Sequence, residues 1–113
     1  MMSINPGDVV TVDFPGVNGI KRRPAVVLSS VAYHSLRPDV IIGLITTQSI
    51  GLGSTDYPLQ DWRLAGLKSA SIFRSFIVTL PRSTNFIVIG HLTERDWKEV
   101  RNCLKIALAD LDD

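Results

Sequence analysis

The chain has 113 residues, 45% of them hydrophobic and 20% charged, and a formal net charge of +1. Such a length fits one compact domain, residues 1–113, and such a composition predicts a buried core and excludes a disordered chain. No apolar stretch is long enough to cross a bilayer, and the first residues lack the basic start and apolar block of a secretory signal, so we expect a cytoplasmic protein without a membrane partner.

The N-terminal half is dominated by strand-like segments. Residues 8–14 are rich in β-branched side chains and alternate in part, which predicts a first strand. Glycine, proline and asparagine in residues 15–19 predict a loop after it. Residues 25–30 and 40–46 are predicted as two further strands. Because neither alternates cleanly between polar and apolar residues, we expect both to be covered on both faces.

A run of three cations, Lys21-Arg22-Arg23, stands between that loop and the second strand. Pro24 removes one backbone donor and biases Arg23 towards an extended conformation, which holds Arg23 at the mouth of the strand. The run is open to two interpretations. Charge blocks are usually solvated faces, whereas a guanidinium held in this way also fits a phosphate with its forked donors.

The C-terminal half starts irregularly and ends in a helix. Residues 47–68 are broken by glycine, serine and proline, although Tyr57 and Trp62 indicate that they pack on the body. Strands are predicted over residues 71–80 and 86–89, with a turn over 81–85 between them. Thr93, followed three places on by Asp96, resembles a capping box. The helical stripe that follows it consists of Trp97, Val100, Leu104, Ala107, Leu108 and Leu111, and we expect it to pack on the parent sheet.

About five short strands and one helix predict a mainly β protein, a small, strongly bent antiparallel barrel with a C-terminal helix. The charges of this body are biased. Residues 1–92 hold eight Lys/Arg and five Asp/Glu, whereas residues 93–113 hold four and six. A mildly basic body with an acidic tail permits an anionic ligand on the body.

Most of the familiar catalytic patterns are missing from the sequence. It contains no phosphate-binding glycine loop, zinc pattern or nucleophile elbow, so we expect neither a metal nor a cofactor. His34 and His91 are far apart in sequence. His91 lies just before the helix cap, where a structural hydrogen bond is the ordinary role, and catalysis as a base is the alternative considered for either histidine. Cys103 has no partner for an internal disulfide and is expected to pack as a small hydrophobic side chain.

An arginine-and-hydroxyl set remains as candidate chemistry: Arg23 at a strand start, Thr46 at a strand end and Arg74 within a strand. Arg74 interrupts an apolar run, where a charge needs a partner or an outward-facing position. It lies either on an outward face or in a cleft, where with Arg23 it would hold an anion. Two arginines near a hydroxyl suit phosphoryl transfer, because they stabilise the charge that builds up on the equatorial oxygens.

Four segments resemble the MazF/PemK-like toxins of type II toxin–antitoxin systems, and the PemK-like branch in particular. They are Gly7 to Phe14, Arg23-Pro24-Ala25-Val26-Val27-Leu28-Ser29, Ile45-Thr46-Thr47-Gln48, and Asp61 to Leu67 running on to Arg74 and Thr79-Leu80. No single motif is highly specific, but their order and spacing agree over nearly the whole chain.

The resemblance implies a homodimer of small SH3-like barrels that cleaves single-stranded mRNA without metal and is silenced by a cognate antitoxin. In that chemistry the ribose 2′-OH attacks the adjacent phosphorus, giving a 2′,3′-cyclic phosphate and a 5′-hydroxyl. Arg23, Thr46 and Arg74 match the family's catalytic positions, and we expect Lys21, Arg22 and Gln48 to contact the RNA. The sequence departs from the family after Arg74, where Ser75-Phe76-Ile77 contains no acidic residue, so the general base is unassigned.

Two other functions are compatible with the same barrel. The related CcdB-type toxins poison a protein target, DNA gyrase, without cleaving nucleic acid. A catalytically weak barrel that only binds RNA or a partner is the other alternative, and the missing acidic residue favours it. The arginine–proline and Ile-Thr-x-Gln matches favour the ribonuclease, because a gyrase poison has no need of an arginine–threonine pair in a cleft.

Overall fold

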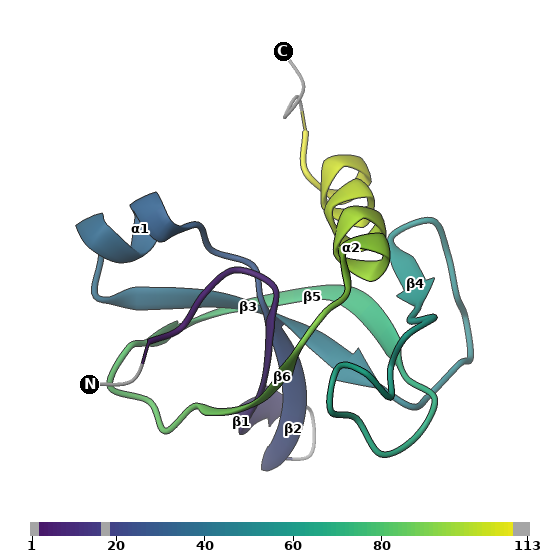
Figure 1. The fold of residues 1–113 in the computed structure, drawn as a ribbon, viewed down its shortest axis with the longest axis horizontal. Helices are drawn as coiled ribbons and strands as arrows, with labels where there is room; N and C mark the ends of the chain where they lie inside the picture. Colours follow the sequence, from purple (N-terminus) through teal and green to yellow (C-terminus); the bar gives the residue numbers. More distant parts are fainter. Residues whose placement is uncertain (1–2, 17–18, 110–113) are drawn as a thin grey trace.

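The structure is a computed structural model that describes residues 3–16 and 19–109. The elements follow in the order β1 (Asp8–Gly16), β2 (Gly19–Val27), α1 (Val31–Leu36), β3 (Asp39–Thr46), β4 (Asp56–Pro58), β5 (Ile72–Pro81), β6 (Ile87–His91) and α2 (Glu94–Ala107). The strands form one antiparallel sheet in the order β4-β5-β3-β2-β1-β6 (Figure 1). The predicted fold class, mainly β with a C-terminal helix, is confirmed.

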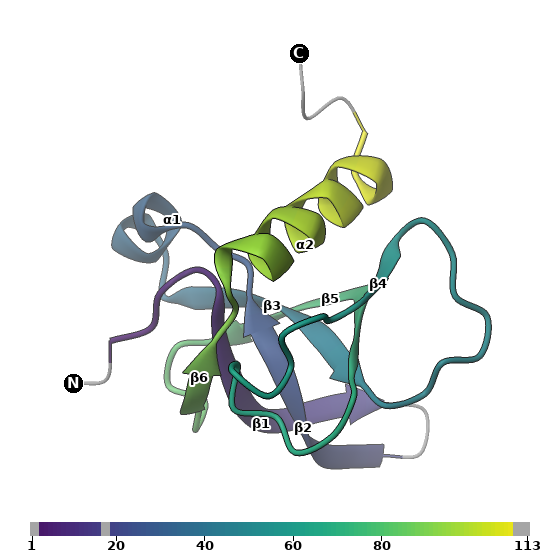
Figure 2. The ribbon, with the colours of Figure 1, turned by 45° about the vertical axis from the view of Figure 1, so that its right-hand side comes forward.

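The sheet bends strongly, but it does not close into a complete barrel. β1 and β2 run across the direction of β3 and β5 (Figures 1 and 2), and β4 and β6 are left as the two edges. The hairpin of β1 and β2 is long, with pairing from Val9↔Val26 to Gly16↔Gly19. Among the described residues, no helix is long and apolar enough to cross a membrane.

Each face of the sheet has its own hydrophobic core, because successive side chains of a strand point to opposite faces. Val9, Val26, Ile45 and Phe73 lie in the core that also contains Val100 and Cys103 of α2. On the other face, away from α2, the core consists of Val10, Val12, Phe14, Ala25, Val27, Val40, Ile42 and Phe86. The strands predicted as covered on both faces, β2 and β3, contribute to both of these cores.

Helix α2 begins where the sequence predicts. Thr93 is its N-cap, and the Thr93 hydroxyl accepts a hydrogen bond from the Asp96 amide at 3.4 Å. Within the predicted stripe, Val100 is buried and Trp97 and Leu104 are half-buried against the core, whereas Ala107 and Leu108 are exposed. The stripe therefore packs on the sheet over its first turns only. Leu111 lies outside the described residues.

Asp96 does not complete the capping box. Its carboxylate is fully buried and accepts hydrogen bonds from the Tyr57 hydroxyl at 2.7 Å and from the amides of Gln60 and Asp61 at 3.1 and 2.8 Å. The Asp61 carboxylate in turn binds the Arg95 guanidinium at 2.6 Å. These contacts fasten β4 and the segment after it to the start of α2. Tyr57 and Trp62 also pack against the core of that face, as predicted for residues 47–68.

The same segment also covers the gap between the two sheet edges. Gly66, with φ of +88°, lies so close to β6 that a Cβ atom there would overlap the Ile89 carbonyl. A Cβ atom on Gly90 would overlap the Ala65 carbonyl in the same way. Only glycine permits two backbones to approach so closely. Through this contact the segment after β4 lies directly against the edge strand β6.

Three details of the predicted secondary structure are wrong. The second strand extends over Gly19–Val27 and not over residues 25–30, because the hairpin continues through most of the glycine-rich loop. A short helix, α1, follows it, with the Ser30 hydroxyl as N-cap. Residues 47–68 contain the short strand β4. Val17 and Asn18 of the predicted loop lie outside the described residues.

Candidate active site

The basic run Lys21-Arg22-Arg23 lies within β2, so its side chains alternate between the two faces of the sheet. Arg23 is paired with the buried Val12, and Lys21 with the buried Phe14. Both cations therefore share the face that lies away from α2. The run predicted to stand between a loop and the start of a strand is instead part of a paired strand, and only two of its three cations point the same way.

Arg22 points to the other face, where it has several partners. Its guanidinium donates to the backbone oxygens of Thr11 at 3.0 Å and Asn85 at 3.1 Å, and to the Thr11 hydroxyl at 3.3 Å. The Asp13 carboxylate lies 3.6 Å away. The structure thus separates Arg22 from Arg23, and its predicted RNA contact stays a prediction.

The other two predicted catalytic residues share the face of Arg23. Leu44 is the partner of Ala25 on one side and of Arg74 on the other, in the adjacent strands β2, β3 and β5. Arg23 lies two residues from Ala25, and Thr46 lies two residues from Leu44, so pleating turns all of them to one face. Thr46 and Arg74 are diagonal neighbours, a relationship that places side chains roughly 7–8 Å apart.

Arg74 holds the segment between β3 and β4. Its guanidinium donates to the backbone oxygens of Gln48 at 3.3 Å and Ile50 at 2.6 Å. The Arg74 side chain is 26% exposed, so the sheet covers most of it, and its predicted place in an anion-holding cleft with Arg23 stays a prediction. An arginine carries five N–H donors in a fixed fork, so the two carbonyls leave donors for a further acceptor.

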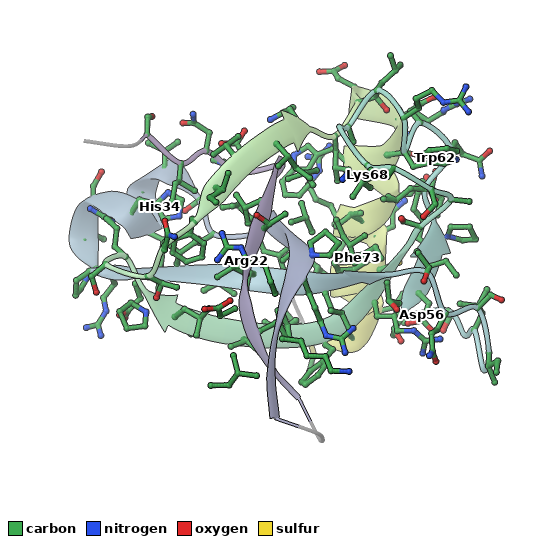
Figure 3. All side chains as sticks on the ribbon, turned by 90° about the horizontal axis from the view of Figure 1, so that it is seen from below. Arg22, His34, Asp56, Trp62, Lys68 and Phe73 are labelled. Atoms are coloured by element: carbon green, nitrogen blue, oxygen red, sulfur yellow. The ribbon has the colours of Figure 1, made fainter. Side chains whose placement is uncertain are left out.

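Sequence reasoning missed Asp56, which faces Arg74 across the sheet. The two residues are directly paired between β4 and β5, and the Asp56 Oδ2 atom lies 4.0 Å from the Arg74 Nη1 atom. The same oxygen accepts the Gly53 amide at 3.0 Å. Figure 3, which looks at the sheet from the side away from α2, shows Asp56 beside β4 and far from His34. A carboxylate therefore borders the site, although none follows Arg74 in sequence.

The Thr46 hydroxyl lies at the end of β3, where the chain turns away from the sheet. It accepts the Gln48 amide at 3.2 Å and is half-buried, whereas the Gln48 side chain is exposed. That hydrogen bond leaves the hydroxyl proton of Thr46 available to an acceptor. Gln48 is linked to the site through its backbone on both sides, because its carbonyl receives Arg74.

Both histidines lie outside this set and have structural partners. His91 Nδ1 lies 2.8 Å from the Asp8 carboxylate, and His34 Nε2 lies 2.5 Å from the Ser29 hydroxyl. Cys103 is buried, as expected, and burial raises the pKa of its thiol, so it is held in the protonated form. Within residues 3–16 and 19–109, no three His, Cys, Asp or Glu side chains are grouped so that they could hold a metal ion.

A bulge in β5 shapes the neighbourhood of Arg74. Pairing with β3 passes from Gly43↔Ile77 to Leu44↔Arg74, which leaves Ser75 and Phe76 without partners in β3. The Ser75 hydroxyl donates to the Thr55 carbonyl at 2.7 Å. Bulges are common beside active sites, since they redirect side chains where a strand would otherwise be regular.

Comparison with known proteins relates this architecture to one family. Residues 5–108 match the PemK-like, MazF-like toxins of type II toxin–antitoxin systems. Among solved structures, a chain of the MazE–MazF complex (form II) from Deinococcus radiodurans superposes with a TM-score of 0.75 at 24% identity, covering 96% of this chain and 98% of that one. An endoribonuclease from a mycobacterial species superposes with a TM-score of 0.74 at 18% identity, covering 95% and 92%.

A mycobacterial endoribonuclease in complex with its cognate antitoxin gives the same TM-score, 0.74, at 18% identity, covering 93% of this chain and 94% of that one. No curated protein matches the sequence. At these identities the solved structures establish a shared fold, whereas the family match spans almost the entire chain. The chain belongs to the PemK-like, MazF-like toxin family of type II toxin–antitoxin systems.

Proposed function

We propose that this chain is a metal-independent endoribonuclease that cleaves single-stranded mRNA at short sequences, as the cytoplasmic toxin of a toxin–antitoxin pair. The observation that carries the proposal is the common face of Arg23, Thr46 and Arg74 on three adjacent strands. Membership of the toxin family and the fold shared with proteins described as endoribonucleases support the same activity.

In the proposed reaction the ribose 2′-OH attacks the adjacent phosphorus and the 5′-oxygen leaves. The products are a 2′,3′-cyclic phosphate and a 5′-hydroxyl. Arg23 and Arg74 stabilise the negative charge that develops on the non-bridging oxygens, and the Thr46 hydroxyl donates a hydrogen bond to one of them. The RNA supplies its own nucleophile, so the reaction needs no metal-bound water.

Each partner in the proposal has its own support. A toxin of this family is paired with an antitoxin, and solved relatives include complexes described as MazE–MazF and as an endoribonuclease with its cognate antitoxin. We propose that an antitoxin silences this chain and that the chain acts as a homodimer. Lys21 lies on the face of Arg23 and extends the positive surface along which an RNA backbone would run.

The test is to incubate the antitoxin-free protein with a long RNA in EDTA and to map the new 5′ ends. We expect cleavage at a short recurring sequence, with 5′-hydroxyl and cyclic phosphate ends. A substrate with 2′-deoxyribose at the mapped site should resist. Rapid cleavage of that deoxy site would exclude internal attack. Growth arrest without any RNA cleavage would point to a protein target such as DNA gyrase, and binding without cleavage to a catalytically weak RNA-binding barrel.

A further inference from the structure

Phe76 is a large apolar side chain that the fold leaves in the open beside the candidate active site. It is 49% exposed, whereas the phenylalanines at positions 14, 73 and 86 are buried. It occupies the bulge of β5, without a partner in β3, two residues after Arg74. Two strand residues span at most about 7 Å, so the backbone of Phe76 lies within about 7 Å of the backbone of Arg74.

The orientation of Phe76 is fixed by a contact with Phe14. The two rings meet edge to face, with centroids 5.4 Å apart and an interplanar angle of 69°. Phe14 belongs to the core on the face away from α2 and is paired with Lys21 of β2. The exposed ring therefore lies on the same face as Lys21, Arg23 and Arg74, and a buried partner holds it in place.

An exposed aromatic ring between cations has the chemistry of a platform for single-stranded nucleic acid. Unpaired bases stack on aromatic side chains while cations hold the phosphates on either side. Lys21 is exposed and Arg23 is half-buried, so both can reach a backbone on this face. An ordered ring loses little conformational entropy when a base stacks on it, because its partner already restricts its rotamers.

We infer that Phe76 is the stacking platform for an unpaired base next to the phosphate held by Arg23 and Arg74. The inference rests on the proposed function for its ligand, single-stranded RNA, and adds to that function the group that binds a base. Stacking accepts every base, so Phe76 would increase the affinity for RNA and position the RNA strand. The preference for a particular RNA sequence has to come from other contacts.

The probe for testing this is a short 2′-O-methyl oligonucleotide of mixed sequence, which lacks the nucleophilic hydroxyl and cannot be cut. Its affinity is measured by fluorescence anisotropy for the intact chain and for Phe76→Ala. We expect the substitution to weaken binding between about 5-fold and about 150-fold, which matches the about 1–3 kcal/mol typical of base–aromatic stacking. Phe76→Trp should retain the affinity, and the fluorescence of the added indole should change on binding.

Two controls make the result specific. Ile106→Ala removes an apolar side chain of similar exposure, 59%, from α2 on the other side of the sheet, and should leave the affinity unchanged. An abasic version of the oligonucleotide should bind the intact chain and Phe76→Ala equally, because it offers phosphates but no base. Lys21→Ala should weaken the binding of both oligonucleotides, since both contain the phosphates.

If Phe76→Ala reduced the affinity for the intact and the abasic oligonucleotide equally, the inference would be overturned. An unchanged affinity together with a changed oligomeric state would also overturn it, and would identify Phe76 as a contact between copies of the chain. Failure of the proposed function looks different. In that case the intact chain binds the oligonucleotide in a Phe76-dependent way and yet leaves RNA uncut.

Discussion

Asp56 and Arg74 are paired across β4 and β5, and one carboxylate oxygen receives the Gly53 amide while lying 4.0 Å from the guanidinium. The Asp56 side chain is only 11% exposed. Arg74 in turn holds the carbonyls of Gln48 and Ile50. Residues 48–56 are thus folded around one guanidinium, and Asp56 limits the positions that this guanidinium can take.

We predict that Asp56→Asn lowers the rate of RNA cleavage through Arg74, as a positioning residue would. Displacement of a catalytic group by about 1 Å can cost up to about a hundredfold in rate. The expected fall is in kcat, and the same substitution in an Arg74→Ala background should have little further effect. Single-turnover cleavage of the four proteins measures this coupling. Asp39→Asn, which removes a carboxylate paired with Arg37 at 3.2 Å elsewhere, is the matched control. Independent, additive losses would contradict the positioning role.

The opposite faces of Arg22 and Arg23 predict unequal effects from similar substitutions. Arg23→Ala should abolish RNA cleavage and toxicity, because loss of one charge-stabilising donor commonly costs on the order of a hundredfold or more. Arg22→Ala should be milder, since its guanidinium is bound to Thr11, Asp13 and Asn85. Cleavage assays and circular dichroism of both variants check this. Equal losses from the two, or none from Arg23→Ala, would remove Arg23 from the site.

The positive face around Arg23 and Arg74 also predicts where inhibition occurs. We expect an acidic C-terminal segment of the antitoxin to bind across this face and displace RNA, with the salt dependence of charge pairing. The measurement is competition between the antitoxin peptide and an uncleavable RNA with a 2′-deoxy site. The peptide and the RNA should exclude one another, and Arg74→Ala should weaken the binding of both. Simultaneous binding would mean that the antitoxin inhibits from a distance.

We predict that His34 makes the stability of the fold depend on pH. Burial, and then the Arg82 guanidinium, lower its pKa from the usual 6.5. The Ser29 hydroxyl accepts the Ile41 amide, so its proton is free for the neutral His34 Nε2 atom. The unfolded chain therefore takes up a proton before the folded chain does as the pH falls, and stability decreases from about pH 6.5 down to the lowered pKa.

Urea unfolding at a series of pH values measures this effect. The free energy of unfolding should be insensitive to His34 above neutral pH and should decline in mild acid. In His34→Gln the decline should be shallower than in the wild-type chain, because the variant has no imidazole to protonate. Identical slopes for the two proteins would show that His34 does not contribute.

We expect substitution of Asp96 to lower the free energy of unfolding more than the other substitutions proposed here. Asp96→Ala leaves the Tyr57 hydroxyl and the amides of Gln60 and Asp61 without their acceptor, and we expect a loss of about 3–5 kcal/mol. Tyr57→Phe removes one hydrogen bond to a charged acceptor and should cost about 1.5–3 kcal/mol. Chemical denaturation checks both. A Tyr57→Phe loss as large as that of Asp96→Ala would show that the two amides contribute little.

Local patterns made much of this fold predictable. The Thr93 cap and the apolar spacing after it place α2, and the β-branched runs place β3 and β5 within one or two residues. Lys21 to Arg23 could not be placed from composition, because glycine and proline nearby indicate a loop whereas pairing with β1 extends the strand. Helix α1 could not be predicted from the sequence either, since its six residues are too few for a clear helical stripe and none of them is buried.

Sequence reasoning named the two arginines and the threonine of the candidate site, which the structure brings to one face, but not the residues around them. Arg23, Thr46 and Arg74 carry chemistry that a sequence shows directly. Asp56 meets Arg74 through the register of a three-residue strand, and Phe76 lies in a bulge of β5. Both depend on pairing between distant segments, which no local pattern of residue types encodes.

The contacts of Gly66 with Ile89 and of Gly90 with Ala65 bring two stretches of main chain together so closely that neither glycine has room for a Cβ atom. The side chains of Arg63 and Leu64, just before this contact, are exposed to solvent. A single added methyl group at either glycine would push β6 and the segment after β4 apart, although it would change neither the polarity nor the charge of this surface.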